Sequence, residues 1–192
     1  RELRRRYFPE DAGWEVRQGS ALDAGFVRGL GQFDVVYSWG VLHHTGAMWD
    51  AIHIAQQAVA PGGEFFIAIY NDQGAWSHRW KRIKRFYCSG PVGKWLVLGT
   101  FVPWWLLRGF IADVVWGRNP FAPYLEYRKG RGMSVVHDWK DWLGGYPFEV
   151  AKPEEIVDDF QARGFRLRTM RTQRGMEGCN EFVFQLERPA GA

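Results

Sequence analysis

The sequence predicts an α/β fold with a mostly parallel sheet and an antiparallel strand near its C-terminal end. Two observations carry this prediction. Strand-like and helix-like stretches alternate over residues 14–70, which is the pattern of consecutive strand–helix–strand units. Two further stretches, 165–169 and 182–186, alternate between apolar and polar residues. Two strands so close together in sequence favour an antiparallel pair at one edge of the sheet.

The first predicted elements are short. Residues 3–8 have the composition of the end of a helix. Residues 14–18 alternate between apolar and polar side chains and therefore predict a short strand. A turn is expected at 19–23, where small and polar residues gather, and a helix at 24–30.

Two buried strands flank the next predicted helix. Residues 33–38 form an apolar run headed by Asp34, which predicts a strand buried on both faces, as in a parallel sheet. Thr45 is a suitable N-cap for a helix with one apolar stripe. The stripe has spacings of four, three and four residues and consists of Met48, Ile52, Ala55 and Val59. Pro61-Gly62-Gly63 should stop this helix before a second buried strand at 65–70.

The middle of the chain breaks the strand–helix rhythm. Residues 74–147 hold most of the 11 tryptophans and a basic helical stretch at 80–85, so they predict a helical insertion or lid. This divides the chain into a core segment at 1–73, the insertion, and a closing segment at 148–192. The closing segment should begin with a helix at Pro153, because proline suits the first helical turn.

An apolar stretch at 95–116 has two interpretations. Its length approaches that of a membrane-spanning helix, but Pro103, Arg108, Asp113 and two glycines interrupt it. One interpretation is a buried or lid helical pair. The other is an interfacial anchor that makes peripheral membrane contact through residues 78–116, where a basic helix precedes the apolar stretch.

The bulk properties narrow the classes of function. The net charge of +4 and the pI of about 9.2 are too weakly basic to indicate a nucleic-acid partner. Cys88 and Cys179 lie far apart and form no metal-ligand spacing, so no metal is expected. A reduced, cytoplasmic setting fits this cysteine content, with membrane association as the alternative given above. The sequence does not indicate an oligomeric state.

A ligand site is expected where the predicted parallel strands end. In open α/β sheets, ligands bind outside the carboxyl ends of the strands. The segments that follow the three predicted strands are 19–23, 38–45 and 70–74, and each is rich in small or polar residues. This composition suits a pocket for a polar cofactor.

Three blocks in these segments resemble class I S-adenosylmethionine-dependent methyltransferases. They are Gly19–Asp23, Phe33–His44 with its Leu42-His43-His44 motif, and Ala60–Ile67 with its Pro-Gly-Gly turn. Their order and spacing match over 14–72, and the general pattern returns at 153–187. The resemblance implies a Rossmann-like core, S-adenosylmethionine as the cofactor, and methyl transfer to an O, N or C atom of a small molecule. The aromatic insertion suggests an apolar, aromatic or lipid-linked acceptor.

The sequence departs from the family at its beginning. The family's glycine-rich loop after the first strand and its acidic residue after the second strand are not found here. The resemblance therefore implies a core truncated at its N-terminus and an incomplete, inactive piece of such an enzyme.

The resemblance also assigns roles to the cofactor-binding segments. Asp23 would accept a hydrogen bond from the adenine amino group, although it also suits the N-cap of the next helix. Ser20 and Ala21 would offer backbone groups, and Leu22 would pack against the ring. The floor below the sulfonium would consist of Ser38, Trp39 and Gly40, where glycine permits close approach.

Candidate catalytic and substrate-binding residues follow the strands predicted at 33–38 and 65–70 or lie in the insertion. His43 and His44 are an acid–base pair or, in the alternative, structural residues. Asp72 is either a base or a turn residue. Residues expected to face the substrate are Tyr70, Asn71, His137, Trp139, Trp142 and Tyr146. The last four are equally compatible with a packed lid that contacts no ligand.

Two other classes of function stay open at the level of sequence. One is a non-catalytic, methyltransferase-like binding module. The other is a nucleotide-binding oxidoreductase, which the His-His and Pro-Gly-Gly blocks disfavour.

Overall fold

The computed structural model describes residues 2–11, 13–122, 124, 127, 132 and 134–188. Its strands are β1 (Phe33–Trp39), β2 (Val59–Tyr70), β3 (Phe165–Arg171) and β4 (Cys179–Leu186). The helices of the first half are α1 (Glu2–Tyr7), α2 (Ala24–Arg28), a 3-10 turn (Leu42–His44) and α3 (Met48–Gln56). The later helices are α4 (Ala75–Tyr87), α5 (Pro91–Val115), α7 (Val135–Gly144) and α8 (Pro153–Ala162).

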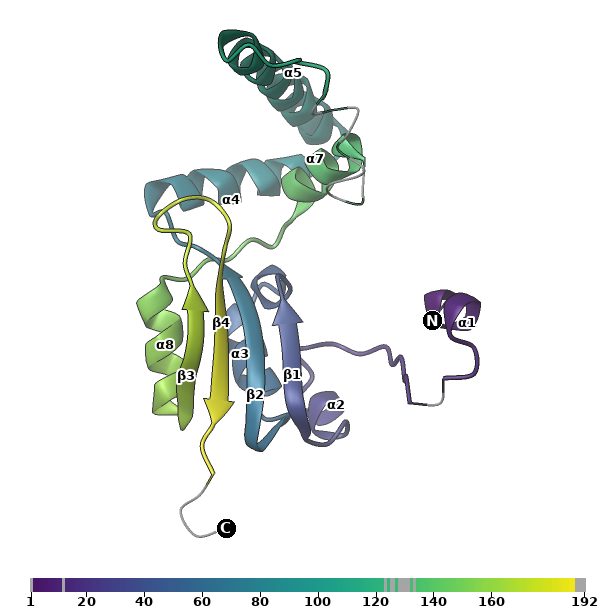
Figure 1. Ribbon diagram of the computed structural model, residues 1–192, viewed down its shortest axis with the longest axis vertical. Helices are drawn as coiled ribbons and strands as arrows, with labels where there is room; N and C mark the ends of the chain where they lie inside the picture. The colour runs from purple at the N-terminus through teal and green to yellow at the C-terminus, as the bar shows by residue number, and fades with distance from the viewer. Residues whose placement is uncertain are drawn as a thin grey trace.

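The four strands form one sheet in the order β1-β2-β4-β3 (Figure 1). β1 and β2 are parallel, with Val36 opposite Phe65 and Trp39 opposite Ala68. β4 runs antiparallel to both β2 and β3. The α/β class and the antiparallel pairing of the last two strands are therefore confirmed.

The main core lies between one face of the sheet and the helices α3 and α8. Side chains alternate across a strand, so every second residue of β2 points into this core. The large, fully buried members are Ile52, Phe65, Ile67, Ile69, Ile156, Phe160, Phe182 and Phe184. The Phe160 and Phe184 rings stack with centroids 4.0 Å apart, which fixes α8 against β4.

A helical layer made of α4, α5 and α7 lies beyond the carboxyl ends of β1 and β2 (Figure 1). This layer has a second, smaller core, which consists of Trp80, Tyr87, Val97, Leu143 and Phe148. β2 leads directly into α4, so the chain enters the layer from the edge of the sheet where ligands bind in α/β folds.

α5 is the longest helix and the one described helix that is long and apolar enough to cross a membrane. α5 has 25 residues, and its most apolar window of 18 residues has a mean hydropathy of 1.4, with 6% of that window buried. The ability to cross a membrane is judged from length and composition alone. The low burial shows that α5 is not a core helix of this chain.

The strand predicted at 14–18 is wrong. Residues 14–20 have no regular secondary structure, and the Trp14 ring packs against Phe8 instead, with centroids 5.2 Å apart. A strand exists only where a neighbouring strand satisfies its backbone groups. No strand pairs with this segment in the part of the chain that the structure describes.

The prediction that residues 33–38 are buried on both faces is also wrong. β1 is an edge strand in the described sheet, and Val35 and Tyr37 are 56% and 66% exposed. The apolar run correctly predicted a strand in a parallel pair. It could not show whether both sides of that strand would be covered.

Two predicted helix boundaries differ from the structure. Thr45 does not cap α3, since the N-cap is Ala47. The Thr45 hydroxyl instead donates to the Leu42 carbonyl (2.8 Å) and closes the 3-10 turn. Pro61-Gly62-Gly63 lies within β2 rather than after a helix. A Cβ on Gly63 would come within 3.0 Å of the Phe33 and Asp34 carbonyls, so the two strands approach closely at a glycine.

Candidate functional site

The turn after β1 has open space beside its glycine. Ser38 and Trp39 end the strand, and the Gly40 N–H donates to the Ala68 carbonyl on β2 (3.2 Å). Gly40 has a φ of 74°, which glycine adopts without strain, and a Cβ there would meet no atom within 4 Å. The Tyr37 and Trp39 rings stack 5.6 Å apart and leave aromatic surface exposed beside the turn.

The loop at 20–23 is held by local hydrogen bonds. Asp23 Oδ1 accepts from the Phe26 N–H (2.9 Å) and caps α2, while Ser20 Oγ accepts from the Leu22 N–H (3.1 Å). Leu22 is partly exposed, and Ala21 packs against the main core. No hydrogen bond or ring contact joins this loop to residues 38–40 within the described ranges, and α2 lies near the amino end of β1 (Figure 1).

His43 is buried at the end of the sheet. Its Nδ1 accepts from the Tyr70 N–H (3.4 Å), which places the ring proton on Nε2, and its ring lies 4.1 Å from that of Tyr70. Nε2 is buried and has no hydrogen-bond partner among the described atoms. Burial, reinforced by the nearby His44, lowers the pKa of His43 to about 3. His43 is therefore neutral near pH 7 and a weak base.

His44 has a different geometry from its neighbour. Its Nδ1 lies 2.7 Å from the Pro147 carbonyl, and a carbonyl only accepts, so Nδ1 carries the proton. The lone pair is then on Nε2. A Cβ on Gly145 would approach His44 Cε1 to 2.9 Å, so the glycine leaves room for the ring. A base oriented through its other nitrogen is the arrangement that proton abstraction requires.

The residues after β2 are mainly structural. Asp72 Oδ1 accepts from the Gly74 N–H (2.8 Å), as a turn residue does. The buried Asn71 side chain donates to the Met176 carbonyl (3.1 Å) and accepts from Asn180 (3.0 Å). Burial raises the pKa of Tyr70 to about 12, so its hydroxyl stays protonated at neutral pH.

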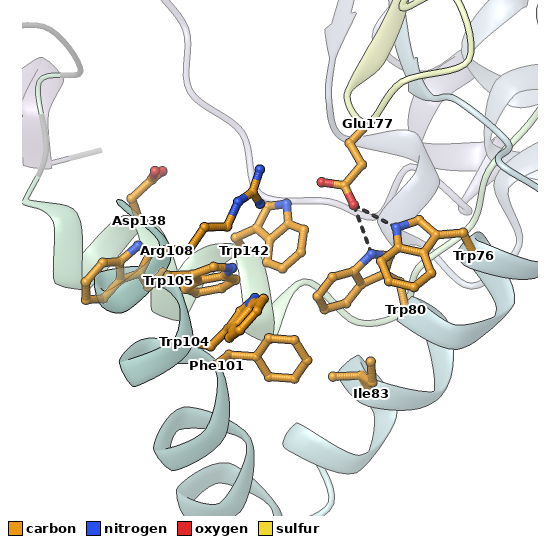
Figure 2. Close-up of a pocket in the computed structure, with 11 residues that line it drawn as sticks. Trp76, Trp80, Ile83, Phe101, Trp104, Trp105, Arg108, Asp138, Trp142 and Glu177 are labelled. Atoms are coloured by element: carbon orange, nitrogen blue, oxygen red, sulfur yellow. Dashed lines mark hydrogen bonds between the residues drawn. The ribbon is translucent and has the colours of Figure 1, made fainter. Parts of the chain in front are cut away.

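A tryptophan-lined cavity of about 440 Å³ lies among α4, α5, α7 and the loop before β4. Figure 2 shows the Trp76 and Trp80 side chains converging on Glu177. Both indole N–H groups donate to the same carboxylate oxygen, at 2.9 and 3.1 Å. The other lining residues are Ile83, Phe101, Trp104, Trp105, Arg108, Asp138, Trp139 and Trp142.

The structure brings two of the four predicted insertion residues into this cavity. Trp139 and Trp142 line it, whereas His137 and Tyr146 do not. His137 lies in the first turn of α7, where its Nδ1 is 2.6 Å from Ser134 Oγ. The cavity residues of α4 and α5 were not predicted as site residues. Their three- and four-residue spacings could have shown that they share helix faces, namely Trp76 and Trp80 on α4, and Phe101, Trp104, Trp105 and Arg108 on α5.

Lys84 was not predicted as a buried residue. It is almost fully buried, and its ammonium donates to the Trp142 carbonyl and lies 4.5 Å from the Trp142 ring centroid. Burial lowers the pKa of Lys84 to about 8. This side chain joins α4 to α7 through a cation–π contact and a hydrogen bond to Trp142, which also lines the cavity.

Comparison with known proteins gives structural matches alone. No protein-family model matches the sequence, and no curated protein matches it significantly. PKMT2 from Rickettsia typhi, solved in complex with AdoHcy, aligns with a TM-score of 0.52 at 12% identity, over 88% of this chain and 39% of that one.

Two other solved structures are less similar by TM-score. An O-methyltransferase family protein from Burkholderia thailandensis has a TM-score of 0.46 at 16% identity, over 93% of this chain and 36% of that one. TnmH has a TM-score of 0.43 at 17% identity, over 96% and 39%. The chain thus spans less than two fifths of the length of each of these three proteins. The likeness to PKMT2 shows that this chain has the Rossmann-like α/β fold that its sequence predicts.

Proposed function

We propose that this chain contributes to S-adenosylmethionine-dependent methyl transfer to a small apolar acceptor. One observation carries the proposal. An open, glycine-containing turn ends β1, and a tryptophan-lined cavity lies in the helical layer beyond the same edge of the sheet. A polar cofactor and an apolar acceptor would then meet where α/β folds bind ligands.

The cofactor side of the proposal rests on the fold and on this turn. The matched PKMT2 structure contains AdoHcy, which is what remains of S-adenosylmethionine after its methyl group has left. Gly40 has space where a side chain would otherwise stand, so Ser38–Gly40 could approach the cofactor with backbone atoms. Asp23 uses Oδ1 to cap α2, and its second oxygen would accept from an adenine amino group.

The chemistry required of the protein is mainly alignment. The sulfonium of the cofactor already makes the methyl group reactive, so the chain must orient the acceptor and exclude water. For a hydroxyl acceptor, His44 Nε2 is the better oriented base, because His43 is buried and a weak base, and its Nδ1 lone pair is engaged by the Tyr70 N–H.

The acceptor side of the proposal rests on the cavity. Its volume lies within the range of small-molecule sites, which is roughly 300–1,000 Å³. Indole rings supply most of its wall, and Glu177 is held in place by Trp76 and Trp80. These walls favour a flat or apolar molecule, with the carboxylate as a polar contact that fixes its orientation.

Calorimetric titration with S-adenosylhomocysteine tests the cofactor assignment. It should be carried out on this chain and on a form extended upstream in its native reading frame. Binding is expected in the extended form. Gly40→Ala should weaken it at least tenfold, because the new methyl group occupies the open turn and its φ of 74° is strained.

Gly31→Ala is the matched control. Gly31 also has a positive φ of 89°, and a Cβ on it would meet no atom within 4 Å, but it precedes β1 rather than following it. It should carry the same backbone strain and leave binding unchanged. If neither form binds while both are folded, the cofactor assignment is wrong and a non-catalytic module replaces it.

A further inference from the structure

α5 exposes a continuous apolar stripe along its whole length. The stripe has helical spacings of three and four residues and consists of Val92, Leu96, Gly99, Pro103, Leu107, Phe110 and Val114. All seven residues are exposed, and Val92 and Leu107 retain 71% and 55% of their accessible surface. A solvent-facing helix surface is normally polar, so this one lacks a partner among the described residues.

The opposite side of α5 carries both the packing contacts and the basic residues. Phe101 and Trp105 face α4 and α7, with the Trp105 ring 5.5 Å from that of Trp142. Lys94 and Arg108 lie on this side by their helical spacing, and Arg108 lines the tryptophan cavity. α5 therefore carries its basic residues on the side that packs against α4 and α7, and apolar residues on the side that faces solvent.

Basic residues dominate the charge of α4 and α5, where Asp113 is the one acidic residue. Residues 73–112 include seven lysines and arginines and no aspartate or glutamate. Four of the seven are exposed on α4, namely Arg79, Lys81, Arg82 and Arg85. In a chain with a net charge of only +4, these seven basic residues lie on α5 itself and on the helix that precedes it in sequence. Such a pairing is complementary to a bilayer with anionic headgroups.

We propose that the exposed stripe of α5 is a binding surface for an anionic lipid bilayer. The stripe would enter the boundary between headgroups and acyl chains, and the basic residues of α4 would contact the headgroups. Trp95, Trp104 and Trp116 are exposed along and beyond the stripe, and tryptophan is favoured at that depth. The inference goes beyond the proposed enzymatic function and does not depend on it.

The geometry favours a helix that lies in the membrane surface rather than one that crosses it. α7 follows α5 in the chain and returns to it, with the Trp139 ring 5.9 Å from that of Trp105. If α5 crossed a bilayer, the connecting segment 117–134 would have to cross back. That segment contains four arginines and lysines and Glu126, which makes a crossing through hydrocarbon costly.

Vesicle co-sedimentation tests this proposal. The protein is mixed with phosphatidylcholine vesicles that contain no anionic lipid or about a third phosphatidylglycerol. Preferential binding to the anionic vesicles is expected. The double variant Leu107→Glu and Val114→Glu should lower the partition coefficient roughly tenfold or more, because two apolar contacts with the acyl region are replaced by charge.

Two matched controls separate the apolar and the electrostatic contributions. Met170→Glu changes an exposed apolar residue on β3 and should leave binding unchanged. Arg82→Gln with Arg85→Gln should weaken binding to the anionic vesicles roughly tenfold. Arg166→Gln with Arg168→Gln, on β3, removes the same charge elsewhere and should have little effect.

Three outcomes would overturn the proposal. They are the absence of vesicle binding, binding that the α5 variant does not reduce, and a concentration-dependent dimer in light scattering that the α5 variant abolishes. The last would identify a second copy of the chain as the partner of the stripe. S-adenosylhomocysteine titration of the same variants keeps this result separate from the enzymatic proposal, since Leu107 and Val114 lie outside the cofactor turn.

Discussion

His43 and His44 are adjacent in the chain, but the fold gives them different chemistry. The Tyr70 backbone and ring enclose His43, whereas the Pro147 carbonyl orients His44 from 103 residues away in sequence. The sequence identified the pair as candidates for acid–base chemistry. It could not show that one ring is buried and that the other is oriented by a backbone carbonyl, because that difference depends on contacts made far along the chain.

The depressed pKa of His43 predicts a loss of stability in acid. Below its ordinary value of 6.5 the unfolded chain takes up a proton that the folded protein does not bind until about pH 3. The free energy of unfolding should therefore fall as the pH drops from 6.5 towards 3, by on the order of 5 kcal/mol. Denaturant titrations of the wild type and of His43→Phe measure this loss, which the variant should not show.

His78→Phe, on the exposed side of α4, is the control for this measurement. Its free energy of unfolding should fall with decreasing pH as steeply as that of the wild type. His43→Phe also removes the acceptor for the Tyr70 N–H, so the comparison is made between slopes rather than absolute stabilities. Equal slopes in all three proteins would contradict the assignment of the acid response to His43, whose titratable neighbours are His44 and Lys84.

The depressed pKa of Lys84 predicts how the stability changes at alkaline pH. Its pKa is lowered from 10.5 to about 8 by burial, so between these values the unfolded chain keeps a proton that the folded protein has released. The unfolding free energy should rise with pH over this window, by on the order of 3 kcal/mol. The difference in stability between wild type and Lys84→Met, followed by urea denaturation from pH 7.5 to 10.5, isolates the effect.

Lys81→Met provides the comparison on the same helix, because Lys81 is exposed. The difference in unfolding free energy between Lys81→Met and the wild type should not change over the same pH range. A flat difference for Lys84→Met as well would show that Lys84 is hydrated in solution rather than buried against Trp142 and Phe148.

At the scale of elements, local patterns predicted those helices and strands whose partners are also present. The helix α8 and the strands β3 and β4 follow their apolar spacing closely, since each packs into the main core. α3 follows it as far as Ala55, but Val59, the last residue of the predicted stripe, begins β2. The strand predicted at 14–18 failed because alternation describes the segment alone. It carries no information on whether a neighbouring strand exists to accept its hydrogen bonds.

The junction between α4 and α5 depends on one glycine. A Cβ on Gly93 would lie 2.0 Å from the Phe86 carbonyl oxygen, whereas one on Gly99 would meet nothing within 4 Å. Gly93→Ala should therefore lower the free energy of unfolding by about 1–3 kcal/mol. Gly99→Ala should leave it unchanged or raise it by up to about 1 kcal/mol, since alanine favours a helix. Thermal denaturation of the two variants, followed by circular dichroism, checks this order, and equal effects would contradict the close contact.

For the whole molecule, the sequence indicated the sheet and the helical insertion but not the direction in which the insertion faces. Residues 95–116 were compatible with a lid or with an anchor, because an apolar stripe does not say what covers it. In the structure this stretch belongs to one continuous helix, α5, which has two different sides. One side of α5 lines the tryptophan cavity through Phe101 and Trp105, and the other side is exposed through Leu107 and Val114.

The edge position of β1 has a consequence for the 192-residue chain in concentrated solution. The outer backbone groups of β1 have no strand beside them in the described sheet, and the Val35 and Tyr37 side chains of the same strand are exposed. An uncovered, β-branched edge is a template on which another molecule can add a strand and start a fibril. Thioflavin fluorescence should therefore rise with time and protein concentration, and Val35→Lys should delay it, while Val136→Lys on α7 should not. If the lysine at 35 brought no delay, growth would have to begin on another surface.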